Sequence, residues 1–138
     1  MSIKDERKRA SRELPSETPE RLRLTPASEI RDARVRMVVD FIGANLHRKI
    51  SLVDMGRQVG ISAAHVTRLF RSQTGISPNE YLIRLRMKEA ETLLSTGMLS
   101  IKEFMARTGY LNRGHFIEHF HRYFNLTPFE FKKKCLLS

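Results

Sequence analysis

The chain has 138 residues, with 25 lysines and arginines against 15 aspartates and glutamates, so its formal net charge at pH 7 is +10. This length suits one domain, or two very small ones that share a core. The charge indicates a polyanionic partner, with nucleic acid ahead of a membrane surface. No apolar run approaches the ~18 residues that span a bilayer, and the start lacks the apolar core of a signal peptide. We therefore expect a cytoplasmic protein without a membrane partner.

The basic charge lies in the part of the chain that we expect to fold. Residues 1–27 are predicted to form a disordered or linker tail, because charged residues alternate there with serine, threonine and proline. Residues 1–33 contain 8 basic and 7 acidic residues, which leaves 17 basic and 8 acidic residues for 34–138, a net charge of +9. A solvated tail therefore does not account for the charge.

Residues 28–76 are predicted to form a first helical subdomain. A helix can begin from Thr25 and Pro26 onward, and its apolar face consists of Val35, Val38, Val39, Ile42 and Leu46. Next, Ser51 and Asp54 form a capping-box pattern that opens a short helix, and Gly60 ends it. The apolar residues of the following basic helix are Val66, Leu69 and Phe70. A short helix, a glycine turn and a second helix are typical of a helix-turn-helix motif.

Residues 77–97 are predicted to form a linker helix. Ser77 can cap it, Pro78 suits its first position, and Glu80 can complete a capping box. Its apolar residues fall mainly on one helical stripe and are Tyr81, Leu82, Leu85, Ala90, Leu93 and Leu94. Thr96 and Gly97 supply a stop signal. About 18 residues at ~1.5 Å each make a stiff spacer of roughly 27 Å.

The segments on either side of this helix are diverged copies of each other. Residues 51–81 align with residues 100–131 after one insertion, so that Gly60 corresponds to Gly109 and Phe70 to Phe120. Residues 98–138 are therefore predicted to form a second helix-turn-helix subdomain. No segment alternates with the period of a β-strand. We predict an all-α fold of about seven helices, in which the linker helix joins two helix-turn-helix subdomains.

The helix-turn-helix pattern points to double-stranded DNA. The second helix of such a motif enters the major groove, where base edges present a distinguishable pattern of donors and acceptors. The candidate reading helices are residues 62–73 and 112–123. Successive major grooves on one face of a duplex lie about 34 Å apart, a distance that the linker helix suits. One molecule can then read two successive grooves at a site without twofold symmetry.

The two-copy arrangement, with RLFRSQTGISPNEYLIRLRMKEAETLL in the middle and HFIEHFHRYFNLTPFEF at the end, resembles the DNA-binding domain of the AraC/XylS transcriptional regulators. The resemblance covers residues 34–134. It implies a seven-helix bundle of two helix-turn-helix subdomains, and a bacterial, nucleoid-associated regulator that binds promoter DNA. We also expect contact with RNA polymerase, and a monomer through this domain.

Carried onto this sequence, the resemblance implies base-facing positions in both reading helices, which are Ala63, Ala64, Thr67, Arg68, Asn112, Arg113, Gly114, Ile117 and Glu118. Arginine suits guanine, and threonine or alanine suits a thymine methyl group. Our candidates for contacts to the DNA backbone are Ser51, Ser62, Arg71, Ser100, His121 and Arg122. Family members usually carry alanine at the position of Gly56, where the helices of the motif approach closely. Glycine there is expected to cost about 0.5–1 kcal/mol of helix stability.

Other classes of function are weaker. His115 and His119 have a spacing that can bind zinc, but no third ligand is evident, so we expect no metal and no cofactor. The chain has no phosphate loop, nucleophile elbow or paired carboxylates, so we expect no enzyme. The alternatives are a non-specific or RNA-binding basic module and a helical protein-interaction module. Single-strand binding usually needs exposed aromatic rings, whereas the rings here occupy predicted core positions.

Overall fold

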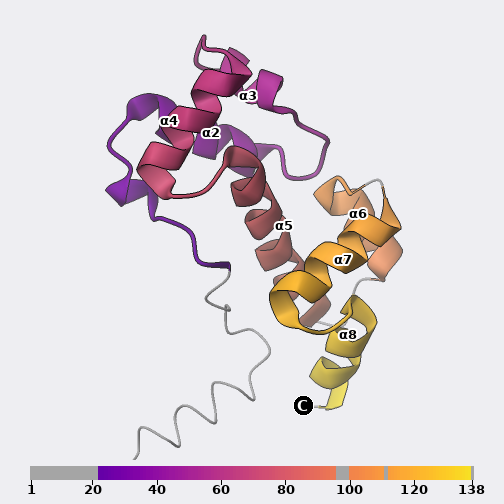
Figure 1. Ribbon diagram of the computed structural model, residues 1–138. Coiled ribbons are helices and arrows are strands. Elements are labelled where there is room, and N and C mark those ends of the chain that lie inside the picture. Colours follow the sequence, from indigo (N-terminus) through magenta and orange to yellow (C-terminus); the bar gives the residue numbers. More distant parts are fainter. Residues whose placement is uncertain (1–21, 96–99, 111, 138) are drawn as a thin grey trace, which may run out of the picture.

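The computed structural model describes residues 22–95, 100–110 and 112–137, and every regular element in these ranges is a helix. A 3-10 turn, Ala27–Glu29, precedes α2 (Ala33–Ala44), α3 (Leu52–Arg57), α4 (Ala63–Thr74), α5 (Pro78–Ser95), α6 (Ile101–Thr108), α7 (Arg113–Phe124) and α8 (Pro128–Leu137). Figure 1 shows α2, α3 and α4 at one end of the molecule, α6, α7 and α8 at the other, and α5 between them. The predicted all-α fold with two helix-turn-helix units is confirmed. Among the described helices, none has the length and apolar character needed to cross a membrane.

Two hydrophobic cores share α5. The first consists of Ile30, Val35, Val38, Ile42, Ile50, Met55, Val66, Phe70, Tyr81 and Leu82. The second consists of Leu22, Ile83, Met87, Ala90, Leu94, Phe104, Tyr110, Phe116, Phe120, Tyr123 and Phe131. The predicted stripe on α5 is too narrow, because Ile83 and Met87 are buried as well. A helix that lies between two cores buries more than one side.

The N-terminal part of the structure differs from the prediction. No α-helix begins at Thr25 and Pro26; α2 begins at Ala33, where the Asp32 carboxylate accepts a hydrogen bond of 2.8 Å from the Arg34 N–H. Leu22, within the predicted tail, is fully buried in the second core. Leu22 and Leu24 alternate with arginines and do not follow a helical period, so sequence patterning missed this anchor. Residues 1–21 of the predicted tail lie outside the described residues.

Local hydrogen bonds fix the starts of the helices largely as predicted. Capping boxes open α3, α6 and α8: the serine or threonine hydroxyl and the acidic side chain each accept from the other residue's backbone N–H, at 2.9–3.2 Å. Their backbone donors lower the pKa of Asp54, Glu103 and Glu130. In α5 the prediction holds only in part: Ser77 Oγ accepts from the Glu80 N–H, but the Glu80 carboxylate pairs with Arg84 at 3.1 Å. The predicted stop of α5 at residues 96 and 97 lies outside the described residues.

The two halves meet at a joint centred on Arg86 of α5. Its side chain, only 8% exposed, donates from Nη2 to the Arg48 carbonyl at 2.7 Å and from Nε to the Leu46 carbonyl at 3.3 Å. The same guanidinium lies 5.2 Å from the centre of the Tyr110 ring in the second half. At Gly109 (φ 75°), an added Cβ would lie 2.8 Å from the Arg48 backbone nitrogen. The loop before α3 therefore packs directly on the turn between α6 and α7.

Gly56 packs closely against the start of α4, at the position where the resemblance implies that the helices of the motif approach each other. An added Cβ would lie 3.3 Å from the Ile61 carbonyl carbon and closer still to the Ile61 oxygen. The Gly56 carbonyl also accepts from the Ile61 N–H at 3.0 Å. Here glycine permits the close approach of α3 to the start of α4, and its helix-propensity cost is offset by that contact.

We predict that Gly56→Ala lowers the free energy of unfolding by about 1–2 kcal/mol, because overpacking against backbone outweighs the gain in helix propensity. The matched control is Gly43→Ala in α2, where an added Cβ meets nothing within 4 Å. That control should raise stability by up to ~1 kcal/mol. Denaturant unfolding of both variants measures the difference, and equal stabilisation of both would refute the close contact at Gly56.

We predict that Gly109→Ala destabilises the protein more than Gly75→Ala. Both glycines have positive φ, 75° and 81°, so both substitutions cost about 1–2 kcal/mol of backbone strain. Only at Gly109 does the added methyl also meet the Arg48 backbone, whereas at Gly75 it meets nothing within 4 Å. A further loss of at least ~1 kcal/mol in chemical denaturation is expected for Gly109→Ala. Identical losses would show that the two halves do not press together there.

Candidate nucleic-acid interface

The exposed face of α4 lies opposite its buried stripe. Val66 and Phe70 face the first core, while Ser62 caps the helix by accepting from the His65 N–H at 3.1 Å. Four predicted contact residues on or next to α4 are exposed, namely Ser62, Ala64, Arg68 and Arg71. Ala63 and Thr67 are partly buried. The Thr67 hydroxyl donates to the Ala63 carbonyl at 2.9 Å, so the side chain offers a methyl group and an acceptor to a ligand.

Most of the predicted base-facing positions at the start of α7 are exposed. Asn112, Arg113, Gly114 and Glu118 are exposed, but Ile117 is partly buried and packs against the second core. Asn112 Oδ1 accepts from the His115 N–H at 2.9 Å, which leaves the Asn112 amide NH₂ as the available donor. Glu118 also pairs with Arg122 at 3.6 Å, so a predicted base contact and a predicted backbone contact partly neutralise each other.

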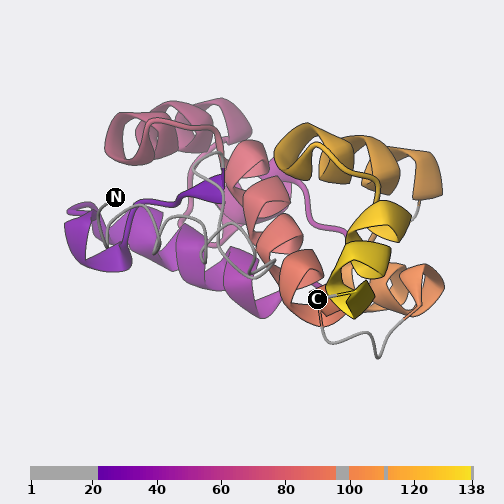
Figure 2. The same ribbon diagram turned by 90° about the horizontal axis from the view of Figure 1, so that it is seen from below.

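The structure brings the two reading helices to one side of the molecule. Figure 2 shows α4 and α7 along the same side, with the start of α5 between them. The other predicted backbone contacts, Ser51, Ser100 and His121, are exposed. Ser51 and Ser100 cap α3 and α6, the first helix of each motif. The arrangement presents two helices on one side of the molecule, separated by the start of α5, to a ligand longer than either.

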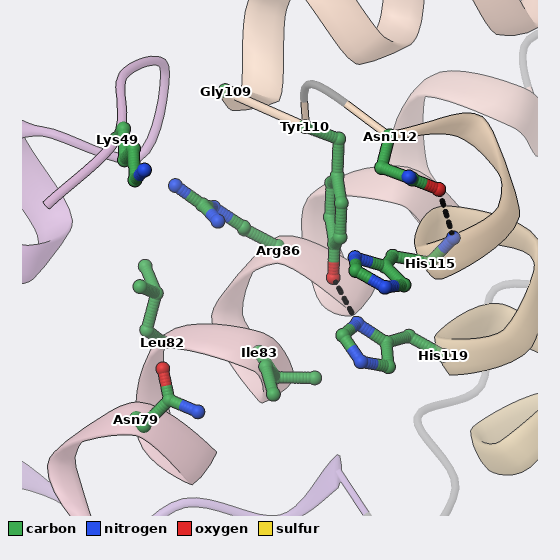
Figure 3. A pocket seen from close by; sticks show the side chains of 10 residues that line it. All are labelled: Lys49, Asn79, Leu82, Ile83, Arg86, Gly109, Tyr110, Asn112, His115 and His119. Carbon is green, nitrogen blue, oxygen red and sulfur yellow. Dashed lines mark hydrogen bonds between the residues drawn. The ribbon is translucent and has the colours of Figure 1, made fainter.

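A cleft between the two halves was not predicted from the sequence. It has a volume of about 280 Å³ and lies between the first turns of α5, the start of α7 and the loop before α3. Its polar residues are Lys49, Asn79, Arg86, Tyr110, Asn112, His115 and His119 (Figure 3). They come from separate segments of the chain, so no spacing pattern identifies them together. Only their assembly at the joint creates the cleft.

Burial sets the charge state of the groups at the base of this cleft. The Tyr110 hydroxyl lies 2.9 Å from His119 Nδ1. Burial raises the pKa of Tyr110 to about 12 and lowers the pKa of His119, so at neutral pH the pair is an uncharged hydrogen bond. Desolvation also lowers the pKa of Arg86, although arginine remains protonated at physiological pH. In the described part of the chain, no group of three or more acidic, histidine or cysteine side chains could hold a metal.

Comparison with known proteins gives a consistent picture. A family model described as a helix-turn-helix domain matches residues 55–134. The lactose operon transcription activator of Staphylococcus xylosus is 31% identical over 98 residues, which are 71% of this chain and 35% of that protein. The Msm operon regulatory protein of Streptococcus mutans is 28% identical over 102 residues, 74% of this chain and 37% of that protein. The chain thus spans about a third of the length of these relatives.

Solved structures show the same arrangement of helices. A probable AraC family transcriptional regulator from Rhodopseudomonas palustris superimposes with a TM-score of 0.67 at 28% identity, covering 75% of this chain and 98% of that chain. The DNA-binding domain of AdpA, solved in complex with a target DNA, gives a TM-score of 0.69 at 26% identity, covering 74% and 92%. Together with the family match over more than half of its length, this places the chain in the AraC-type helix-turn-helix family.

Proposed function

We propose that the chain regulates transcription by binding double-stranded promoter DNA at a specific sequence, with α4 and α7 in two successive major grooves of an asymmetric site. The observation that carries this proposal is the placement of two exposed helices on one side of the molecule, on either side of α5 (Figure 2). A single chain then presents both readers, so the proposal needs no dimer. RNA polymerase is a further proposed partner, and the similarity to a lactose operon transcription activator and an Msm operon regulatory protein supports a role in transcription.

The base contacts are unequal in the two halves. In α4, Arg68 is exposed and suits the two acceptors of guanine, while Ala63, Ala64 and Thr67 can meet thymine methyl groups. In the second half, Arg113 and Gly114 are exposed next to Asn112, but Ile117 is half-buried and Glu118 is paired with Arg122. The first half is therefore expected to contribute more of the sequence preference.

The remaining contacts hold the DNA backbone. Arg71, His121 and Arg122 are exposed cationic or titratable side chains on the reading helices. The serines that start the helices, Ser51, Ser62 and Ser100, place backbone N–H groups where phosphates can accept from them. These contacts set the position of the protein on the duplex, and the base-facing residues select the sequence.

A non-specific or RNA-binding module is the rival proposal. Single-stranded nucleic acid is usually held by stacking on exposed aromatic rings. Phe70 of α4 and Phe116, Phe120 and Tyr123 of α7 are all buried, so neither reading helix presents a free ring from this set. The polar and basic faces of α4 and α7 favour a duplex groove instead.

Selection from a random duplex library tests the proposal. We expect one enriched site with two unequal halves whose centres lie about 10 base pairs apart, because the two helices reach successive grooves on one face. Affinity should fall steeply with salt as counterions are released. Binding without any enriched sequence would overturn the proposal in favour of a non-specific module.

We predict that Arg68→Ala relaxes the base preference at one position of the first half-site and weakens binding to the selected site by about 1–3 kcal/mol. Arg71→Ala is the matched comparison, since it removes the same charge from the same helix. If Arg71 contacts the DNA backbone, Arg71→Ala should weaken binding to all duplex sequences alike. It should also lower the salt dependence of binding by about one phosphate contact. If Arg68→Ala changed neither the base preference nor the affinity, the proposed placement of the first reading helix would be wrong.

A further inference from the structure

The cleft between the two halves concentrates positive charge without a matching acid. Lys49 enters it from the loop before α3 and Arg86 from α5, and Figure 3 shows their nitrogen ends pointing towards one another. None of the ten residues that line the cleft carries a carboxylate. Two cations that converge on a hollow without an acid favour an anionic ligand.

The carboxylates that act on His119 of the cleft are already paired. Glu80 and Glu118 both act on the pKa of His119, which lines the cleft. Glu80, however, forms an ion pair of 3.1 Å with Arg84, and Glu118 forms one of 3.6 Å with Arg122. Neither neutralises the charge of Lys49 or Arg86.

Arg86 has an unused donor at the cleft. Its Nε and Nη2 atoms donate to the backbone carbonyls of Leu46 and Arg48, and Nη1 has no hydrogen-bond partner among the described residues. The side chain is more than nine-tenths buried and lines the cleft, so the free end of the guanidinium serves a ligand there. The Asn112 amide NH₂ and the His115 ring add further donors from the start of α7.

We propose that this cleft is a phosphate site, filled in the DNA complex by one backbone phosphodiester of the strand that crosses from the first major groove to the second. The inference rests on the proposed function. Between two successive major grooves the narrower minor groove faces the protein, with a phosphate strand on each side. The start of α5 lies between α4 and α7 on this side (Figure 2), and Asn79 of its first turn lines the cleft.

Such a phosphate ties the two halves together. It accepts from Lys49 of the first half, from Arg86 of the linker helix, and from Asn112 or His115 of the second half. The site reads no base, because a phosphodiester is the same in every sequence. It sets the spacing of the two reading helices on the duplex and adds about one phosphate to the salt dependence of binding.

The test combines Lys49→Ala with duplexes that carry a single neutral methylphosphonate at successive positions of the selected site. For the natural chain, one position between the two half-sites should weaken binding on the order of tenfold, the effect of one charge-assisted hydrogen bond. Lys49→Ala should lose a similar factor, and the same methylphosphonate should then cost less than about twofold. For Lys49→Ala on the unmodified duplex, the slope of log affinity against log salt should be shallower than that of the natural chain by ~0.9.

Arg68→Ala is the matched control, because it also removes one positive charge but from a base-facing position. The central methylphosphonate should weaken the binding of Arg68→Ala by the same factor as it weakens the binding of the natural chain. If the losses from Lys49→Ala and from every methylphosphonate multiply independently, the cleft does not hold a DNA phosphate. The proposed function survives that result, since it fails only if the natural chain shows no sequence preference for duplex DNA.

A free phosphate compound is the other source of the same chemistry. Inorganic phosphate is therefore titrated into the natural chain and into Lys49→Ala while the ring proton signals of His115 and His119 are followed by NMR. If the cleft holds a DNA phosphate, we expect the His115 and His119 signals to shift only weakly, and only at many millimolar phosphate. Saturation at submillimolar phosphate in the natural chain, without coupling to any methylphosphonate, would overturn it and assign the cleft to a small phosphorylated ligand.

Discussion

The contact between the two halves across α5 is the constraint on which the arrangement of the reading helices depends. Arg86 satisfies two carbonyls of the first half and lies against the Tyr110 ring of the second, and Gly109 lets the Arg48 backbone approach. A guanidinium suits this position because its donors are fixed in a plane whose face can stack on a ring. Without this joint, only the packing of α5 in the two cores would hold α4 and α7 relative to each other.

Sharing one helix between two cores gives the chain two similar units in a fixed relation. In many DNA-binding proteins a dimer supplies the second reading helix, and the symmetry of the dimer makes the site palindromic. Here an internal repeat supplies it, and the copies have diverged. The first presents an exposed Arg68, whereas in the second Glu118 is paired with Arg122 and Ile117 leans into the core. Unequal halves of a DNA site follow from unequal copies.

The sequence predicted what local spacing determines. The capping box at Ser51 needs only residues three apart, and the reading face of α4 follows from helical periodicity around Val66. The joint escaped prediction because Arg86 bonds to carbonyls 38 and 40 residues away, and backbone carbonyls carry no sequence signal. For the same reason the cleft at Lys49 appears only when the chain is folded.

The most direct test of the account is to insert about five base pairs, half a turn of DNA, between the two halves of the selected site. Two reading helices held on one side of one rigid molecule cannot follow half-sites that face opposite sides of the duplex. The account predicts that affinity falls to that of the first half-site alone, and that an insertion of a full turn does not restore it because the helices cannot separate by a further ~34 Å. Unchanged affinity after the half-turn insertion would contradict it.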